Sequence, residues 1–242
     1  MSLQNKVVIV TGGASGMGYE EAKLFVEKGA RVAIFDIDGE GAEKTAAEFG
    51  NGTIGLKADL TNPDDIKAAI EKTVATFGEI DVLVNNAGVF DKYLPSLETS
   101  RDTWNKFIAL NLTSVFDMCN AVLPKMIEKK SGNIVNIASV AGIVAGKGGA
   151  AYTATKHAVI GYTKHLVSEY AKYGIRINAV CPGTIETPLT KDVLANIPKD
   201  LVPARRFGQA KEVAELVAFL ADEQAGFVNG ATIVADGGFT IQ

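Results

Sequence analysis

The sequence predicts an α/β protein built as a doubly wound parallel sheet, a three-layer sandwich with helices on both faces of the sheet. Short β-branched runs alternate with longer helical patterns along the chain, which is the order of repeated strand–helix units. The expected strands show little polar alternation, as is typical of strands covered on both faces. A glycine-rich turn joins the first expected strand to the first helix.

The expected elements follow one another in a regular order. The strands are short apolar runs and comprise 7–10, 32–35, 82–84, 134–137 and 175–180. The helices are longer patterns and comprise 18–28, 39–49, 63–77, 103–129, 152–173 and 211–221. Pro63 suits a first helical turn, with Asn62 or Thr61 as its cap. No linker, composition shift or internal repeat divides the chain, so we expect residues 1–242 to form a single domain.

The composition excludes several classes of protein. The 242 residues are 47% hydrophobic and 21% charged, which excludes intrinsic disorder. A net charge of −4 without a basic block predicts neither a nucleic-acid partner nor an anionic membrane partner. Cys119 and Cys181 form no metal-ligand or redox pair by spacing, so we expect a reducing compartment and no metal site. Residues 1–6 do not resemble a signal peptide, and the longest apolar stretch noted, around 134–146, is too short to span a bilayer. A cytoplasmic location is expected.

The glycine-rich turn spans Thr11 to Gly18 and lies between a strand and a helix. Glycines at 12, 16 and 18 allow a tight turn and a close approach to a pyrophosphate. The helix N-terminus that follows offers free N–H groups and the positive end of its dipole. This context favours a dinucleotide-binding loop over an ordinary turn. No Gly-Lys-Ser/Thr follows, so a kinase or other P-loop protein is excluded.

Asp36 ends the second expected strand, 18 residues after Gly18. An acid at about this distance binds the ribose hydroxyls of NAD, and its charge would repel a 2′-phosphate. Ile37, Asp38 and Gly39 follow it, and position 15 is Ser, so no basic residue adjoins it in the sequence. The sequence therefore predicts NAD(H) over NADP(H). The alternative is that Asp36 caps the next helix.

Tyr152 and Lys156 lie four residues apart and share one face of an expected helix. A nearby ammonium stabilises a phenolate, so we expect Lys156 to lower the pKa of Tyr152 toward neutral pH. Such a phenol can exchange protons in alcohol–ketone chemistry. Ser139 follows the strand 134–137, at the sheet edge where ligands bind, and could polarise a substrate carbonyl. Tyr-x-x-x-Lys alone is common by chance, but its combination with Ser139 and the phosphate loop favours a catalytic site.

Over nearly its whole length, the chain resembles the short-chain dehydrogenase/reductase family, in its compact single-domain branch. The resemblance is carried by six motifs in the family's order, which are Thr11-Gly12-x-x-x-Gly16-x-Gly18, Asp59, Asn85-Asn86-Ala87-Gly88, the set Asn111, Ser139, Tyr152 and Lys156, the segment Pro182-Gly183-x-Ile185-Glu186-Thr187, and Asp236-Gly237-Gly238. Ser139 precedes Tyr152 by 13 residues, as in most members. The resemblance implies a Rossmann-like fold with a seven-stranded parallel sheet.

The resemblance also implies roles for the matching residues. Tyr152 is similar to the acid/base, Lys156 to the residue that binds the nicotinamide ribose and tunes the tyrosine, and Ser139 to the residue that orients the carbonyl. Asn111 is similar to a helix-kink residue whose main chain holds a water of a proton relay. With Tyr152 and Lys156, the implied cofactor-binding residues are Gly12, Ser15, Gly16, Met17, Gly18, Asp36, Ile37, Asp59, Leu60, Asn86, Ala87, Gly88, Pro182, Gly183, Ile185 and Thr187.

Three functions remain open at this point. The first is an NAD(H)-dependent oxidoreductase that interconverts a secondary alcohol and a ketone by hydride transfer. The second is a 3-oxoacyl-carrier-protein reductase of fatty acid synthesis, which usually takes NADPH. The third is a non-catalytic dinucleotide-binding sensor on the same fold.

The polar stretch 191–206 is interpreted as a flap over a small-molecule substrate. The resemblance further implies a homotetramer with helices 103–129 and 152–173 at the subunit interface.

Overall fold

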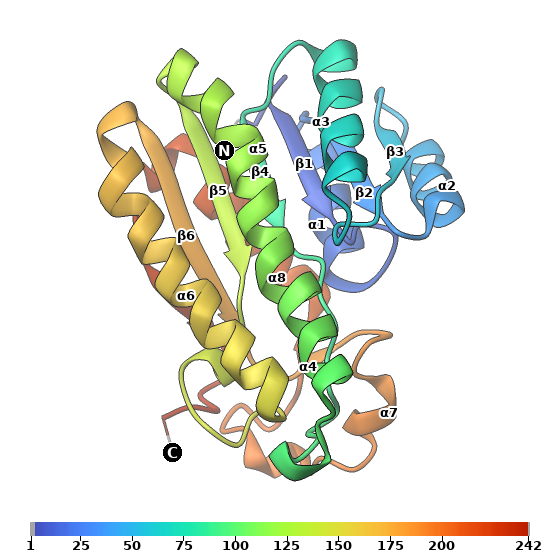
Figure 1. Cartoon of the computed structure of the whole chain (residues 1–242), viewed down its shortest axis with the longest axis vertical. Helices are drawn as coiled ribbons and strands as arrows, with labels where there is room; N and C mark the ends of the chain where they lie inside the picture. The colour runs from blue at the N-terminus through green and yellow to red at the C-terminus, as the bar shows by residue number, and fades with distance from the viewer. Residues whose placement is uncertain (1–2, 242) are drawn as a thin grey trace.

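A parallel sheet of seven strands forms the centre of the computed structural model, which describes residues 3–241 (Figure 1). Its strand order is β3-β2-β1-β4-β5-β6-β9. The seven strands are β1 (Val7–Thr11), β2 (Arg31–Asp36), β3 (Ile54–Lys57), β4 (Val82–Asn85), β5 (Gly132–Ile137), β6 (Ile175–Pro182) and β9 (Thr232–Ala235). Two short strands, β7 (Ile185–Glu186) and β8 (Gly208–Gln209), pair with each other apart from this sheet. The predicted doubly wound, seven-stranded fold is confirmed.

The helices occupy the connections between the strands. They are α1 (Gly16–Glu27), α2 (Gly39–Phe49), α3 (Pro63–Phe77), α4 (Arg101–Ile108), α5 (Ser114–Lys129), α6 (Ala150–Tyr170), α7 (Lys191–Leu194) and α8 (Ala210–Ala221). Short helical turns comprise η1 (Ser96–Glu98), η2 (Ala109–Thr113), η3 (Val140–Gly142), η4 (Ala171–Tyr173), η5 (Lys199–Leu201) and η6 (Glu223–Ala225). Pro63 is the first residue of α3, and the Asn62 side chain accepts a hydrogen bond from the Asp64 N–H, so Asn62 is the cap.

Two hydrophobic cores lie on opposite faces of the sheet, because successive strand residues point to opposite sides. One core joins the sheet to α3, α5 and α6. The other joins it to α1, α2 and α8. Figure 1 shows α5 and α6 side by side in front of β5 and β6. Central strand residues such as Ile9 and Val10 are fully buried, which explains the lack of polar alternation along the strands.

The two strands at the edges of the sheet are missing from the residue-by-residue prediction. β3 has three partly exposed residues, one of them a glycine, and an exposed Lys57, and β9 has four residues of which Val234 is exposed. Short edge strands of this kind carry weak apolar patterns. Each pairs with only one neighbouring strand, and its side chains are less fully buried. The family resemblance implied both strands, whereas the hydrophobic pattern did not.

The predicted helix 103–129 is one continuous helical stretch from Arg101 to Lys129 with a π-helical turn, η2, in its middle. This stretch is long and apolar enough to span a membrane by length and composition, with a mean hydropathy of 1.4 over its most apolar window. The prediction had found no such stretch. Its apolar residues Val115, Met118 and Val122 are buried against the sheet, so packing in the core accounts for its composition.

The strand order reverses between β1 and β4, and ligands of open α/β sheets bind at such a point, beyond the carboxyl ends of the strands. The loops after β1, β2, β4, β5 and β6 all leave the sheet at this edge because the strands are parallel. The fold therefore brings together the residues that the sequence analysis singled out.

Candidate active site

The loop from β1 to α1 is tightly wound. Gly12 and Gly16 have φ angles of +67° and +61°, which other residues rarely adopt. A Cβ on Gly18 would lie 2.3 Å from the Gly12 carbonyl oxygen and 2.5 Å from Asn86 Nδ2. Only glycine allows this approach of helix and loop. The side chain of Ser15, the N-cap residue of α1, forms no capping hydrogen bond, which leaves the first-turn N–H groups available for an anion.

Hydrogen bonds of Asn86 connect the loop between β1 and α1 to the end of β4. Its Nδ2 donates to the carbonyl oxygens of Thr11 and Gly12 at 2.9 and 3.3 Å. The main-chain N–H groups of Asn86 and Ala87 both donate to Thr11 Oγ1 at 3.0 Å. These bonds fix the loop from the side of the sheet, so an incoming ligand meets a preorganised surface.

Asp36 is directed at the glycine-rich loop. Its carboxylate accepts hydrogen bonds from the N–H groups of Ala14 and Asp38, each at 3.0 Å. The cap of α2 is Asp38, which accepts from the Gly41 N–H, so the alternative role of Asp36 as a helix cap is wrong. Lys57 is the register partner of Asp36 on β3. The chain thus places a basic residue beside Asp36 that the sequence order did not reveal.

Asp59 and Leu60 follow β3 on the same edge. The Asp59 carboxylate accepts hydrogen bonds from the Thr61 hydroxyl at 2.7 Å and the Thr61 N–H at 2.9 Å. These two bonds lower the pKa of Asp59. The carboxylate is therefore ionised and fixed in orientation at neutral pH.

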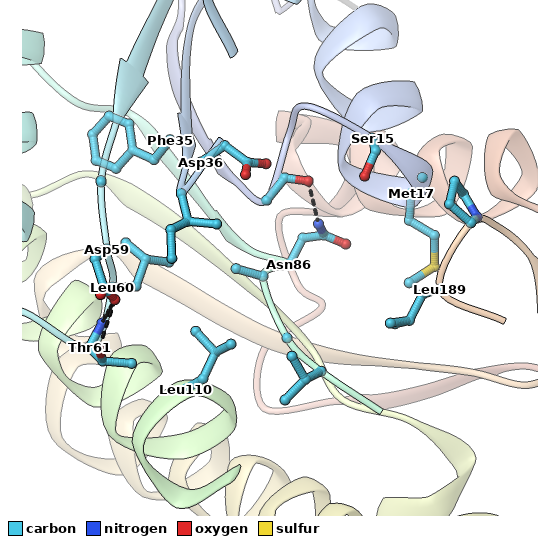
Figure 2. Close-up of a pocket in the computed structure, with 18 of the residues that line it drawn as sticks. Ser15, Met17, Phe35, Asp36, Asp59, Leu60, Thr61, Asn86, Leu110 and Leu189 are labelled. Carbon is cyan, nitrogen blue, oxygen red and sulfur yellow. Dashed lines mark hydrogen bonds between the residues drawn. The ribbon is translucent and has the colours of Figure 1, made fainter. Parts of the chain in front are cut away.

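These residues line a cavity of about 460 Å³. Figure 2 shows Asp36, Asp59 and Leu60 on one side of this cavity, Asn86 in the middle, and Met17 and Leu189 on the other side. The predicted cofactor residues that line it are Gly12, Ser15, Gly16, Met17, Asp36, Ile37, Asp59, Leu60, Asn86, Ala87, Gly88 and Thr187. Gly18 lies behind the loop. The cavity runs from two carboxylates to a helix N-terminus, which fits the ribose and pyrophosphate of a dinucleotide.

A second, smaller cavity of about 80 Å³ adjoins the first and shares Met17, Thr187 and Leu189 with it. Ser139 and Tyr152 line this cavity, together with Pro182, Gly183 and Ile185. Ser139 caps the turn η3, where its Oγ accepts from the Ala141 N–H at 3.1 Å. The two hydroxyl groups singled out in the sequence therefore face one small space beside the larger cavity.

Burial controls the acidity of the catalytic pair. It raises the pKa of Tyr152 to about 12, and the interaction with the Ser139 hydroxyl opposes this rise. Burial also lowers the pKa of Lys156 to about 8. Lys156 Nζ donates to the Ile137 carbonyl oxygen at 2.7 Å and lies 5.6 Å from the centre of the Tyr152 ring. The expectation that Lys156 lowers the pKa of Tyr152 is therefore wrong for this arrangement, in which desolvation of both groups dominates.

Asn111 and Lys156 lie beneath the cavities rather than in their walls. Asn111 is buried in the π-helical turn, which agrees with the kink that the resemblance implied. Its Oδ1 accepts from the Val89 N–H at 2.8 Å, and its Nδ2 donates to the Val89 carbonyl at 2.9 Å. A Cβ on Gly88 would lie 3.1 Å from Asn111 Oδ1 and 3.7 Å from Lys156 Nζ. The loop after β4, Asn111 and Lys156 therefore meet at one point.

Several residues of the site have no signal in the sequence. Asp91 accepts hydrogen bonds from the N–H groups of Gly149 and Tyr152 at 2.8 and 3.0 Å and fixes the start of α6. The Phe90 ring packs edge-on against Tyr152 with the centroids 5.0 Å apart. Tyr93, Lys147 and Phe239 also line the smaller cavity. They come from loops and from the C-terminal segment, whose course only tertiary packing determines.

Nothing within residues 3–241 groups three or more His, Cys, Asp or Glu side chains as metal ligands. The geometry instead resembles a site in which a dinucleotide supplies the redox chemistry. It combines a glycine-rich loop, an acid at the end of β2, and a buried phenol and hydroxyl beside a small cavity.

Comparison with known proteins agrees with this interpretation. A family model described as enoyl-(acyl carrier protein) reductase matches residues 12–240. The chain is 42% identical to a 2-(R)-hydroxypropyl-CoM dehydrogenase of Xanthobacter autotrophicus, over 98% of this chain and 99% of that protein. It is 40% identical to a 3-oxoacyl-(acyl-carrier-protein) reductase of Thermotoga maritima, over the full length of both.

A solved structure of a 3-ketoacyl-(acyl-carrier-protein) reductase from Brucella melitensis, complexed with NADH, is similar with a TM-score of 0.95 and 34% identity. The similarity covers 99% of this chain and 100% of that one. The chain belongs to the short-chain dehydrogenase/reductase family, and it is an oxidoreductase acting on CH–OH groups with a nicotinamide dinucleotide.

Proposed function

We propose that the chain is an NAD(H)-dependent dehydrogenase that interconverts a secondary alcohol and a ketone, with Tyr152 as its acid/base. One observation carries this proposal. The Tyr152 phenol and the Ser139 hydroxyl line a small cavity that opens onto the larger cavity through Met17 and Thr187. A substrate in the small cavity would lie next to a dinucleotide in the large one.

In the reduction direction, Tyr152 donates a proton to the carbonyl oxygen as it becomes an alkoxide. Its pKa of about 12 keeps the phenol protonated at neutral pH, so the proton is present before the reaction starts. The Ser139 hydroxyl donates a hydrogen bond to the same oxygen and orients the ketone. When bound, the nicotinamide supplies the hydride in reduction and accepts it in oxidation.

Lys156 and Asn111 support the phenol from below. Lys156 would hold the ribose hydroxyl groups of a bound nicotinamide, as the family resemblance implies. With a pKa of about 8, it carries a positive charge over the neutral range and can pass a proton to Tyr152 after turnover. Asn111 lies in the π-helical turn, and a water held by its main chain, as the family resemblance implies, would link Lys156 to solvent.

NAD(H) is proposed as the preferred cofactor because Asp36 is oriented at the loop by two N–H groups. A carboxylate there can accept both ribose hydroxyl protons and repels a 2′-phosphate. The second candidate function, reduction of a 3-oxoacyl thioester with NADPH, is favoured by the relatives of that activity, which match the full chain. Lys57 opposite Asp36 is the structural feature that favours it.

The test is a spectrophotometric panel at 340 nm with ketones, diketones, sugars and an acetoacetyl thioester, each with NADH and NADPH. Tyr152→Phe should lower kcat at least 100-fold, since general acid catalysis contributes about 10²- to 10⁴-fold. The Kd for NADH should stay within about threefold. Tyr173→Phe, at a position that lines neither cavity, is the control and should retain most activity. Undiminished turnover by Tyr152→Phe would overturn the mechanism, and activity confined to the thioester with NADPH would favour the second function.

A further inference from the structure

The smaller cavity contains one charged side chain. Its lining within the described residues is otherwise aromatic, aliphatic or neutral polar, and Lys147 is the exception. Lys147 belongs to the loop between η3 and α6, and none of the ion pairs within residues 3–241 includes it. An ammonium facing a substrate cavity without a carboxylate in its wall creates a local positive potential.

Lys147 is held close to the reacting group. Its Nζ lies 3.6 Å from the centre of the Phe239 ring, and Phe239 lines the same cavity. A Cβ on the next residue, Gly148, would lie 2.6 Å from an atom of the Tyr152 ring. The loop therefore packs directly on Tyr152, and a cation–π contact holds the ammonium on a ring that lines the same cavity.

The cavity places the ammonium near the reacting groups. It is small, about 80 Å³, so a short substrate held by Ser139 and Tyr152 also lies close to Lys147. Leu189, Val193 and Ile197, from the segment after β7, complete the wall opposite Ser139 and Tyr152. Lys147 is partly exposed and lies on the Phe239 ring, so its ammonium can form a charge-assisted hydrogen bond with a carboxylate of a substrate in this cavity.

We propose that Lys147 makes this enzyme selective for short secondary alcohols and ketones that carry a carboxylate, that is, small hydroxy acids and oxo acids. The inference rests on the proposed function of the same site. The carboxylate pairs with Lys147 while Ser139 and Tyr152 hold the carbonyl oxygen. An uncharged substrate offers the ammonium no ionic partner, and a site that pairs a charged substrate group discriminates against analogues that lack it.

The first experiment compares acetoacetate and levulinate with their methyl esters as substrates. The wild-type enzyme should reduce the acids with a kcat/KM at least tenfold above that of the esters. Lys147→Met should lower kcat/KM for the acids at least 30-fold and change that for the esters less than threefold, while Lys147→Arg retains the acid preference. Lys172→Met is the matched control, because Lys172 also packs on an aromatic ring, that of Tyr173, and is exposed away from both cavities.

The second experiment does not depend on turnover. Butyrate carries the carboxylate but no reducible carbonyl, and calorimetry measures its Kd for the protein saturated with NADH. The Kd should rise at least tenfold in Lys147→Met and stay unchanged in Lys172→Met. Equal butyrate affinity in wild type and Lys147→Met overturns the inference, as does an equal loss of activity on acids and esters. If the wild type reduces uncharged ketones in the panel, the proposed function stands even when this inference fails.

Discussion

At the scale of single residues, the environment of each side chain decides its chemistry. Tyr152 and Lys156 form the same pair in the sequence and in the structure, but burial moves their pKa values in opposite directions, to about 12 and about 8. Only the charged form of a lysine stabilises a phenolate. A bound dinucleotide or substrate that frees Lys156 from the Ile137 carbonyl would bring the ammonium toward the phenol.

Asp36 carries the prediction on cofactor choice. The wild-type enzyme should use NADH with a kcat/KM at least tenfold above that for NADPH, because repulsion of a 2′-phosphate costs more than about 1.4 kcal/mol. Asp36→Ala should reduce this ratio at least tenfold, since it removes the repulsion and leaves Lys57 in place. Asp38→Ser, which keeps a capping side chain for α2, is the control and should preserve the ratio. Equal use of both cofactors by the wild type would show that Asp36 has been misassigned.

At the scale of elements, helix α1 has its N-terminus at the larger cavity and a buried carboxyl group in its interior. Its N-terminus faces the larger cavity through Gly16 and Met17. One turn later, Glu21 is fully buried, and neither of its carboxylate oxygens has a hydrogen-bond partner within the described residues. Burial raises the pKa of Glu21 to about 8. The side chain is therefore a neutral acid in the folded protein at neutral pH.

This raised pKa predicts a dependence of stability on pH. Because the folded protein binds the Glu21 proton more tightly than the unfolded chain, the contribution of this proton to stability is fully present below about pH 4.5 and is lost as the pH rises to about 8. Glu21→Gln removes the effect. The unfolding free energy of Glu21→Gln minus that of the wild type should therefore increase by about 2–3 kcal/mol between pH 6 and pH 9.

Urea denaturation of both proteins at the two pH values measures this difference. The control is Glu20→Gln, which replaces the neighbouring acid on α1 and retains Glu21. Its difference in unfolding free energy from the wild type should be the same at both pH values. A pH-independent effect of Glu21→Gln would show that the carboxyl group is already ionised in the folded protein, contrary to the burial argument.

At the scale of the whole molecule, the single sheet arranges every functional loop at one edge, while long helices present surfaces that the sheet does not cover. Phe116 on α5 is 51% exposed, and its ring lies 5.9 Å from that of Tyr162 on α6. The two helices that the family resemblance assigns to a subunit interface thus share an aromatic contact at the surface. The single-domain organisation, the cytoplasmic location and the homotetramer remain predictions.

Light scattering coupled to size-exclusion chromatography tests the assembly. The wild type should elute with the mass of four chains, about 102 kDa from 25.5 kDa each. Phe116→Glu should reduce the mass to that of dimers or monomers, because a charge would be buried in the interface without a partner. Leu97→Glu, at a fully exposed position in η1, is the control and should leave the mass unchanged. A monomeric wild type would contradict the expectation.

The sequence by itself determined the fold class, the central strands, most helix positions and the main candidates for the site. These features follow from local chemistry, since glycine spacing, β-branched runs and the spacing of Tyr152 and Lys156 act over a few residues. The tertiary structure alone decided the two edge strands, the role of Asp38 rather than Asp36 as a cap, the pKa values of the buried pair, and the approach of Lys57, Asp91, Lys147 and Phe239 to the site. Each of these features depends on which distant segments of the chain pack together and on how much water they exclude. The local sequence around one residue determines neither the packing nor the exclusion of water.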